Sequence, residues 1–348
     1  MRRPWKHSKN KHDLFECLPD DLVVLILSKL SATASSPSDF INIILTCKRL
    51  NRSGLHRLVL SKAGPKVFAI KPKNWSEYAH SFLKHCVNAG NVDACYTLGM
   101  IRFYCLKNRG SGLSLMAKAA MKLHAPALYS LAVIQFNGSG GSKRDKDLRA
   151  GVALSARASL LGHIDALREL GHCLQDGYGV RQNVTEGRRL LVQANVRELA
   201  YVLRAVAPPS RCCDESSSLL TWGALRCQRK NNNAVSSLAC PLLSDYGYSV
   251  APPEVQPANW FLREWFESGK GKLEEGLRLC AHIGCGRPET RPHEFRRCSV
   301  CGKVNYCSRG CQALDWKLRH KIECSPVEMY GDGGVDVENE FVVPNDAV

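Results

Sequence analysis

The residues of this chain that could do chemistry are concentrated near its C-terminus. Seven of its 17 cysteines lie between residues 280 and 324, and His320 lies at ligand spacing from the last of them. They form four pairs: Cys280 and Cys285, Cys298 and Cys301, Cys307 and Cys311, His320 and Cys324. Thiolate and imidazole ligands favour zinc over hard cations, and eight such ligands fill two tetrahedral sites. Because a complete ligand shell leaves no position for water, we expect structural and not catalytic zinc.

The expected compartment supports metal binding over disulfides. The N-terminus lacks the apolar stretch of a secretory signal, and early acidic residues such as Asp13 and Glu16 argue against a transit peptide. No apolar run is long enough to span a membrane. We therefore expect an intracellular protein, in the nucleus, the cytoplasm or both. In such reducing compartments, clustered thiols bind metals more often than they form disulfides.

The residues between these ligands are typical of a small zinc module. Gly302 follows Cys301, where a zinc knuckle often needs a positive φ angle. From Ser308 onward, apolar residues recur at helical spacing, which predicts a helix that carries Trp316 inward. Residues 280–324 contain too little apolar surface to fold unaided, so metal binding would supply the missing free energy.

Tyr306-Cys307-Ser308, Cys311-Gln312, Trp316, His320-Lys321 and Cys324 together resemble the signature of the MYND-type zinc finger. The resemblance implies a cross-brace, in which alternate ligand pairs share one ion. One zinc would take Cys280, Cys285, Cys307 and Cys311, and the other Cys298, Cys301, His320 and Cys324. His282 and His293 are competing ligands, since the first pair is more widely spaced than usual. The family implies binding of protein segments, often proline-containing peptides. Alternatively, the finger only stabilises the C-terminal end of the protein.

Residues 14–62 form a second candidate unit with three apolar stripes. Leu18-Pro19 opens a helix with acidic residues in its first turn, and a polar stretch, Ser31 to Asp39, separates it from a second stripe that ends in Cys47-Lys48-Arg49. The pattern resembles the F-box, a three-helix module that docks the Skp adaptor of cullin-based ubiquitin ligases. The adaptor contacts that this resemblance implies are Leu18, Pro19, Leu22, Ile26, Leu27 and Leu30. An ordinary three-helix cap on the next domain is the alternative.

The middle of the chain contains an internal repeat. The motif Ala-x3-Leu-small begins at Ala94, Ala127 and Ala166. Periods in the thirties with small residues at helix crossings are typical of stacked helix pairs, an α-solenoid. Asp176-Gly177-Tyr178-Gly179-Val180 and the helix after it resemble a Sel-type repeat, a relative of the tetratricopeptide repeats. This resemblance covers residues 75–206 and implies a concave surface that binds peptides or proteins.

Three further segments complete the predicted organisation. Residues 207–258 lose periodicity and are rich in Pro, Ser and Asn, which predicts a flexible linker. Residues 259–279 begin with clustered aromatic residues, which predicts an amphipathic helix that packs on the solenoid or supports the finger. Residues 325–348 are acidic and contain no Lys or Arg, which predicts a disordered tail. The expected fold is mainly α: a three-helix F-box, an α-solenoid and a small cross-braced two-zinc finger.

These features predict a non-catalytic receptor and not an enzyme. The F-box would dock the Skp adaptor of an SCF-type ligase, while the repeats and the finger would hold a protein substrate close to the ubiquitin donor. The leading alternative is a non-ligase scaffold or transcriptional co-regulator that binds proline-containing peptides through the finger. Both readings place the function in protein–protein interaction.

Other classes of function lack support in the sequence. A lysine methyltransferase, in which this finger type also occurs, would need an Asn-His-x-Cys motif, which this chain does not have. The net charge of +16 is compatible with acidic partners. However, the basic residues are dispersed along expected helical faces without interleaved aromatics, so we do not expect nucleic-acid binding. The glycine clusters at 138–141 and 269–271 lack the spacing of a phosphate-binding loop.

Overall fold

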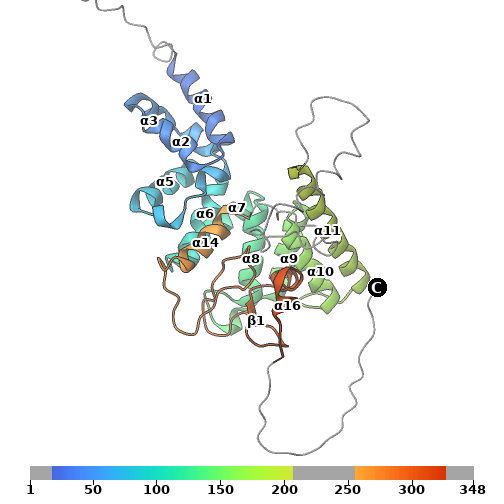
Figure 1. The fold of residues 1–348 in the computed structure, drawn as a ribbon. Helices are drawn as coiled ribbons and strands as arrows, with labels where there is room; N and C mark the ends of the chain where they lie inside the picture. Colours follow the sequence, from blue (N-terminus) through green and yellow to red (C-terminus); the bar gives the residue numbers. More distant parts are fainter. Residues whose placement is uncertain (1–17, 207–254, 327–348) are drawn as a thin grey trace, which may run out of the picture.

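The computed structural model describes residues 18–206 and 255–326. Figure 1 shows short N-terminal helices, then a stack of helix pairs, and a C-terminal segment that returns to lie against the stack. This architecture confirms the predicted mainly-α class. Residues 14–17 of the expected F-box, most of the expected linker and nearly all of the expected tail lie outside the described residues. Within the described part, no helix combines the length and apolar character needed to cross a membrane.

The N-terminal unit contains four helices where the sequence predicts three. They are α1 (Asp20–Thr33), α2 (Pro37–Ile44), α3 (Lys48–Gly54) and α4 (Arg57–Lys62). The second predicted helix is split because Cys47 adopts an extended conformation and caps α3, accepting a hydrogen bond from the Leu50 N–H. The expected break at residues 31–39 is shorter than predicted. α1 continues through Ser31, whose buried hydroxyl donates to the Val59 carbonyl oxygen at 3.1 Å.

The repeats form the predicted solenoid of helix pairs. The helices are α5 (Glu77–Asn88), α6 (Val92–Met100), α7 (Arg109–Met121), α8 (Ala125–Asn137), α9 (Leu148–Leu160), α10 (Ile164–Asp176) and α11 (Val184–Val206). α6 packs on α7, α8 on α9, and α10 on α11. The three repeat motifs lie on α6, α8 and α10, and equivalent residues cap these helices. Asn91, His124 and His163 each accept a hydrogen bond from the N–H of the motif alanine.

Glycines allow the paired helices to cross closely. A Cβ atom on Gly112 of α7 would lie 2.8 Å from the carbonyl oxygen of Gly99 on α6. Gly171 of α10 and Gly187 of α11 face each other in the same way, with a Cβ on Gly187 2.7 Å from the Gly171 carbonyl oxygen. Real Cβ atoms essentially never show such a separation. The small residues that define the repeat are therefore required by the crossing of its two helices.

Short helical turns join these elements: η1 (Pro65–Phe68), η2 (Pro72–Asn74), η3 (Ile101–Cys105) and η4 (Lys143–Asp145). The C-terminal segment contains α14 (Pro257–Glu267), β1 (Arg296–Arg297), β2 (Asn305–Tyr306), α15 (Arg309–Asp315), η6 (Trp316–His320) and α16 (Lys321–Glu323). β1 and β2 form an antiparallel hairpin. The predicted aromatic helix over residues 259–279 ends early, at Glu267. Gly269, two residues later, adopts a left-handed φ of 73°, as is common just beyond a helix end.

The C-terminal segment shares its cores with the earlier parts of the chain. One cluster joins the N-terminal helices and the first repeat to Phe261 and Trp265 of α14. Another joins Tyr96 and Tyr129 of the repeats to the cysteines of the finger. In Figure 1, α14 lies across α6 and the finger lies beside α8 and α10. We call the side of the solenoid formed by α6, α8 and α10 the inner face, and this segment covers it.

Candidate metal centre and binding surfaces

The eight predicted ligands lie in two groups of four. Site 1 consists of Cys280, Cys285, Cys307 and Cys311, and site 2 of Cys298, Cys301, His320 and Cys324. Within each group the ligand atoms all lie within 4.8 Å of one another. The competing candidates, His282 and His293, belong to neither group. These two groups are the cross-braced sets that the resemblance to the MYND finger implies, and their binding of zinc stays a prediction.

The distances between the ligand atoms suit a tetrahedral metal. The Cys285 and Cys307 sulfurs are 3.4 Å apart, and the Cys298 and Cys324 sulfurs are 3.9 Å apart. In site 2, the Cys301 sulfur lies 3.4 Å from the His320 Nε2. Zinc–sulfur bonds of about 2.3 Å in a tetrahedron place sulfurs about 3.8 Å apart. Disulfide sulfurs would lie about 2.05 Å apart, and all described cysteines are free.

A buried cation beside site 1 provides an independent test of the fit. Arg287 is buried, and it donates to the Cys285 sulfur at 3.3 Å and to the Ser130 hydroxyl at 2.9 Å. Its guanidinium also lies 5.8 Å from the centre of the Tyr129 ring. No carboxylate among the described residues forms an ion pair with Arg287, although a buried charge needs a counter-charge. Four thiolates around zinc retain net negative charge, so the residues present fit zinc.

The electrostatics of Arg287 agree with that pairing. Burial acts to lower the pKa of Arg287, but the neighbouring sulfurs of Cys285 and Cys307 outweigh it and raise this pKa well above its usual value. The guanidinium therefore stays charged at any physiological pH. It supports the ligands of site 1 from behind, as outer partners of metal ligands commonly do.

Site 2 lies at the more exposed end of the finger. α15, η6 and α16 carry His320 and Cys324 to the knuckle that holds Cys298 and Cys301. The prediction that Trp316 points inward is wrong: it is 39% exposed, and its ring meets that of His320 edge-on at 5.8 Å. The inward position on this side of the finger belongs to Tyr306, whose hydroxyl donates to the buried Asp315 at 2.8 Å.

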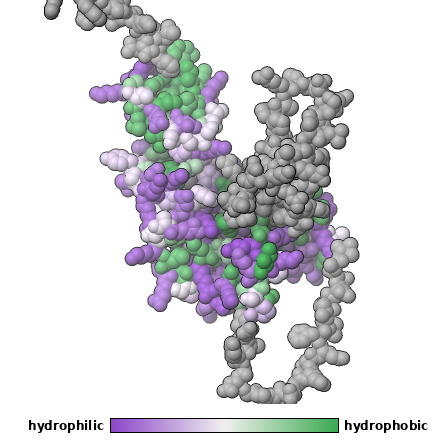
Figure 2. All heavy atoms as spheres, in the orientation of Figure 1, coloured by the Kyte–Doolittle hydropathy of each residue, from purple (hydrophilic) through white to green (hydrophobic). Residues whose placement is uncertain are grey.

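The N-terminal helices present an apolar surface, which Figure 2 shows as green side chains over α1 to α3. On α1, Leu22, Leu25 and Ile26 are 43%, 50% and 42% exposed. Of the six predicted adaptor contacts, Pro19, Leu22 and Ile26 are exposed and Leu18 is half-buried. Leu27, only 3% exposed, and the half-buried Leu30 pack toward the core, and the adaptor contacts of the six residues stay a prediction.

The two short motifs at the ends of the F-box pattern, Leu-Pro and Cys-Lys-Arg, meet in space. Arg49 pairs with Asp20 at 2.9 Å and also donates to the Leu18 carbonyl oxygen. Arg52 pairs with the same carboxylate at 3.0 Å. These contacts hold the chain entering α1 against α3. They fix the position from which α1 presents its exposed apolar side chains.

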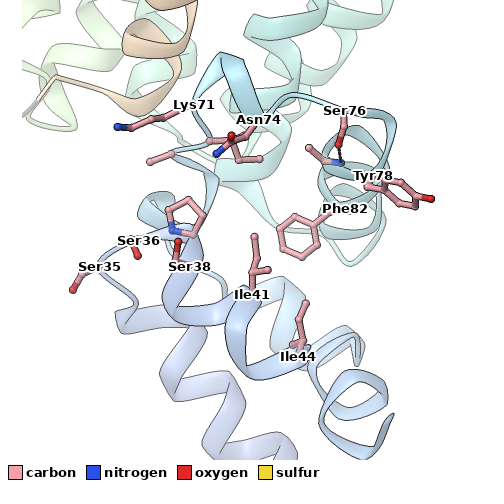
Figure 3. A pocket seen from close by; sticks show the side chains of 14 residues that line it. Ser35, Ser36, Ser38, Ile41, Ile44, Lys71, Asn74, Ser76, Tyr78 and Phe82 are labelled. Carbon is pink, nitrogen blue, oxygen red and sulfur yellow. Dashed lines mark hydrogen bonds between the residues drawn. The ribbon is translucent and has the colours of Figure 1, made fainter. Parts of the chain in front are cut away.

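A groove of about 600 Å³ lies between α2 and α5 (Figure 3). Ile41, Ile44 and Phe82 form its apolar wall, and serine hydroxyls line its rim. Lys71 is the charged residue of its lining. The residues that line it contain no pair of groups that could exchange a proton at neutral pH. Its apolar wall is suited to binding an apolar segment.

Comparison with known proteins assigns two regions to families. Residues 65–169 match the model of plant tetratrico peptide repeats, and residues 280–324 match the MYND finger. Neither of these matches extends into the four N-terminal helices. A Sel1 repeat protein from Oxalobacter formigenes aligns with 34% of this chain and 89% of its own, at 20% identity and a TM-score of 0.31.

Two relatives from Arabidopsis thaliana cover nearly the whole chain. F-box protein At1g67340 is 64% identical over 92% of this chain and 84% of its own length. F-box protein At5g50450 is 58% identical over 96% of this chain and 92% of its own. The chain belongs to this F-box protein family. Its members' shared name is consistent with the F-box resemblance of the N-terminal unit.

Reasoning from the sequence missed several residues of this F-box family member. Leu25 lies on the exposed side of α1. Its orientation could not be inferred from the sequence, because apolar residues occur on several faces of this helix. Arg287 follows Cys285 by two residues, and a basic residue so close to a ligand was an available signal. Glu169 occupies the position that Thr97 and Ser130 hold in the earlier repeats. A charged residue in place of a small one was a signal that this position has another role.

Proposed function

We propose that this F-box family protein is the substrate-recognition subunit of an SCF-type, cullin-based ubiquitin ligase. In this proposal the N-terminal helices dock a Skp adaptor, and the finger, carried by the repeats, binds the target protein. The protein would act inside the cell, in the nucleus, the cytoplasm or both. The observation that carries the proposal is the exposed row of Leu22, Leu25 and Ile26, in a chain with relatives named F-box proteins.

The proposed mechanism requires no catalytic side chain in this protein. A receptor that holds its target beside the loaded ubiquitin-conjugating enzyme raises the effective concentration of the target lysines. What the receptor must supply is a rigid connection between its two ends. The shared core of the N-terminal helices, the first repeat and α14 supports such a connection, because buried side chains from all three pack together.

We further propose that sites 1 and 2 each hold one structural zinc ion. Each site offers four ligands, which complete a tetrahedral shell and exclude a reactive water. When bound, the ions would supply folding free energy and no chemistry. Cys280, Cys285, Cys307 and Cys311 would hold one ion, and Cys298, Cys301, His320 and Cys324 the other.

Adaptor binding is tested by charging the exposed side of α1. We expect Leu22→Asp with Ile26→Asp to weaken co-purification with a Skp adaptor about 100-fold, since each lost apolar contact costs about 1.5 kcal/mol. Both side chains are exposed, so the variant should keep its helical circular dichroism. Leu160→Asp, at a position 86% exposed on α9, is the matched control and should bind as before. Unchanged binding by the double variant would contradict the proposal.

A second candidate function is a scaffold or transcriptional co-regulator that is not part of a ligase. The exposed Trp316 favours it, together with Val300 and Ile322, which are also exposed near site 2. These side chains suit a proline-containing peptide, because aromatic surfaces commonly bind such segments. A protein that captures such peptides but binds no Skp adaptor would support this candidate over the ligase.

A further inference from the structure

One group of contacts between the finger and the repeats involves the ligands of site 1 and their sequence neighbours. Asn137 of α8 is buried and donates its side-chain amide to the Cys307 carbonyl oxygen at 2.8 Å. Arg287, two residues after Cys285, reaches Ser130 of the same helix. Backbone and side chains next to two of the four site 1 ligands are thus bound directly to α8.

The residues between Cys307 and Cys311 bind α10. Glu169 is buried, and its carboxylate accepts from the N–H of Gly310 at 2.7 Å and from the N–H of Arg309 at 3.3 Å. These N–H groups open α15 and have no partner within that helix. Burial raises the pKa of Glu169, while the two backbone N–H groups act to lower it. Arg309 in turn pairs with Asp176 at 2.7 Å, at the end of α10.

The repeat pattern indicates that Glu169 is specialised for this contact. It occupies the position that Thr97 and Ser130 hold in the two preceding repeats, three residues after the motif alanine. Ser130 lies within hydrogen-bond distance of Tyr96 of the preceding repeat, at 3.2 Å. The corresponding tyrosine of the second repeat, Tyr129, meets Ser308 of the finger instead, at 3.3 Å. The finger therefore provides the hydroxyl that a following repeat would otherwise provide.

Within the described ranges, the ligands of site 2 form no hydrogen bond with the repeats. The finger also contacts the repeats through residues 290–294, which lie between Cys285 and Cys298 in the sequence and bind the turn after α8. The Cys298 N–H donates to the Val304 carbonyl oxygen, and the Cys324 N–H to the His320 carbonyl oxygen. Arg319, on η6, binds Asp315 and Ala281. All of these partners belong to the finger itself. The two metal sites thus differ in their neighbours: the ligands of site 1 and their sequence neighbours are bound to the repeats, and those of site 2 to the finger. This holds although the ligand pairs of the two sites alternate along the chain.

We propose that site 1 fastens the finger to the inner face of the repeats, whereas site 2 shapes only the outer part of the finger. The proposal rests on zinc binding as proposed above. When site 1 is filled, residues 285–287 and 307–311 are held in the geometry that α8 and α10 require. The inner face of these helices is then closed to any foreign peptide, and target proteins must bind elsewhere. Emptying site 1 releases that face.

The first experiment compares the loss of each site in the full chain. Cys311→Ser removes a site 1 ligand, and Cys324→Ser removes a site 2 ligand as the matched control. Amide hydrogen exchange is followed in peptides from α8 and α10. We expect Cys311→Ser to accelerate exchange there about tenfold or more, and Cys324→Ser to leave it within about twofold. Equal acceleration in both variants, or in neither, would overturn the proposal.

The second experiment leaves every ligand in place and uses the reciprocity of coupled equilibria. Glu169→Ala should speed zinc loss from site 1 under chelator challenge, with Glu169→Gln intermediate because it keeps one acceptor oxygen. Alkylation by N-ethylmaleimide, mapped by mass spectrometry, tells Cys280 and Cys285 from Cys298 and Cys301. Glu198→Ala removes another buried carboxylate, which pairs with Arg168 of α10 at 2.7 Å, and should leave both sites unchanged. Faster zinc release from both sites in Glu169→Ala would count against a specific role of site 1 in holding the finger on the repeats.

The outcomes separate this proposal from the one on which it depends. Native mass spectrometry of the unmodified chain should show two zinc ions. If it shows none, the proposal of zinc binding and the proposal that site 1 fastens the finger to the repeats fail together. If two zinc ions bind but the site 1 variant leaves amide exchange in α8 and α10 unchanged, only the proposal that site 1 fastens the finger to the repeats is overturned.

Discussion

Glu169 on α10 accepts a hydrogen bond of 2.7 Å from the backbone N–H of Gly310, although 141 residues separate them in the chain. The contact joins the last repeat to the turn between two zinc ligands. It explains why the finger is not an independent module on a linker. The inner face of the repeats, which the repeat resemblance assigns to foreign peptides, is covered here by the protein's own C-terminal segment.

The joint between the N-terminal helices and the first repeat depends on Asn91. Its side-chain oxygen caps α6 at Ala94, while its amide donates to the carbonyl oxygens of Leu60 at 2.9 Å and Ala63 at 2.8 Å. We expect Asn91→Ala to lower the free energy of unfolding by about 2–3 kcal/mol, because a cap and two buried hydrogen bonds are lost. Urea denaturation measures this. Asn183→Ala, which removes an exposed cap of α11, should cost only about 1 kcal/mol.

Equal effects of the two asparagine substitutions would mean that the carbonyl contacts of Asn91 contribute nothing to the joint. Helical content before denaturation should be the same in both variants, since each removes only one side chain at a helix terminus.

Two glycines on α7 should respond to alanine in opposite directions. Gly112 lies at the crossing with α6, and a Cβ there would sit 2.7 Å from the Phe103 backbone nitrogen. We expect Gly112→Ala to destabilise the protein by about 1–3 kcal/mol through overpacking. Gly110 has open space around it, so Gly110→Ala should stabilise by about 0.5 kcal/mol through helix propensity. Thermal unfolding of both variants checks the sign, and a stable Gly112→Ala protein would refute the close crossing.

Removing the metal should affect the repeats as well as the finger. The finger's cysteines and the repeat residues Tyr96 and Tyr129 belong to one core, so loss of zinc leaves that side of the core open. We expect a zinc chelator to lower the Tm followed by helical circular dichroism by about 10 °C. Zinc added back should restore it, and magnesium should not. An unchanged helical Tm would show that the repeats fold without help from the finger.

Stability should also fall in mild acid because of His172. Burial is the main cause that lowers its pKa to about 4. The carboxylate of Asp176 acts to raise this pKa, and three nearby guanidinium groups act to lower it further, those of Arg168, Arg309 and Arg296. Between about pH 6.5 and 4 the unfolded chain therefore binds a proton that the folded chain does not, so stability decreases as the pH falls. We expect His172→Gln to lose about 2 kcal/mol less than the parent between pH 7 and 4.5, allowing for solvent screening.

Urea unfolding at the two pH values gives this difference directly. Acid also protonates the zinc ligands, but that effect is common to both proteins and cancels in the comparison. Parallel loss of stability in the two proteins would rule out His172 as a source of the pH dependence.

The metal ligands were predictable from the sequence because the signal is local. Each pair of ligands is separated by two to four residues, and such spacing is itself the geometry of a knuckle or a helical turn. The helix pairs were predictable for a similar reason. Small residues recur where helices cross, and Asn91, His124 and His163 recur as caps. Both patterns repeat a short-range physical requirement along the chain.

What only the tertiary structure decided is how distant surfaces meet. Periodicity alone does not separate Ile26 from Leu27, because the two are apolar neighbours on α1. Packing of α1 against α4 turns Leu27 inward and leaves Ile26 exposed. In the same way, no local pattern says that Glu169 will meet Gly310. Such pairings depend on the total shape and charge of two folded surfaces, which is why the finger's place on the repeats emerged only from the fold.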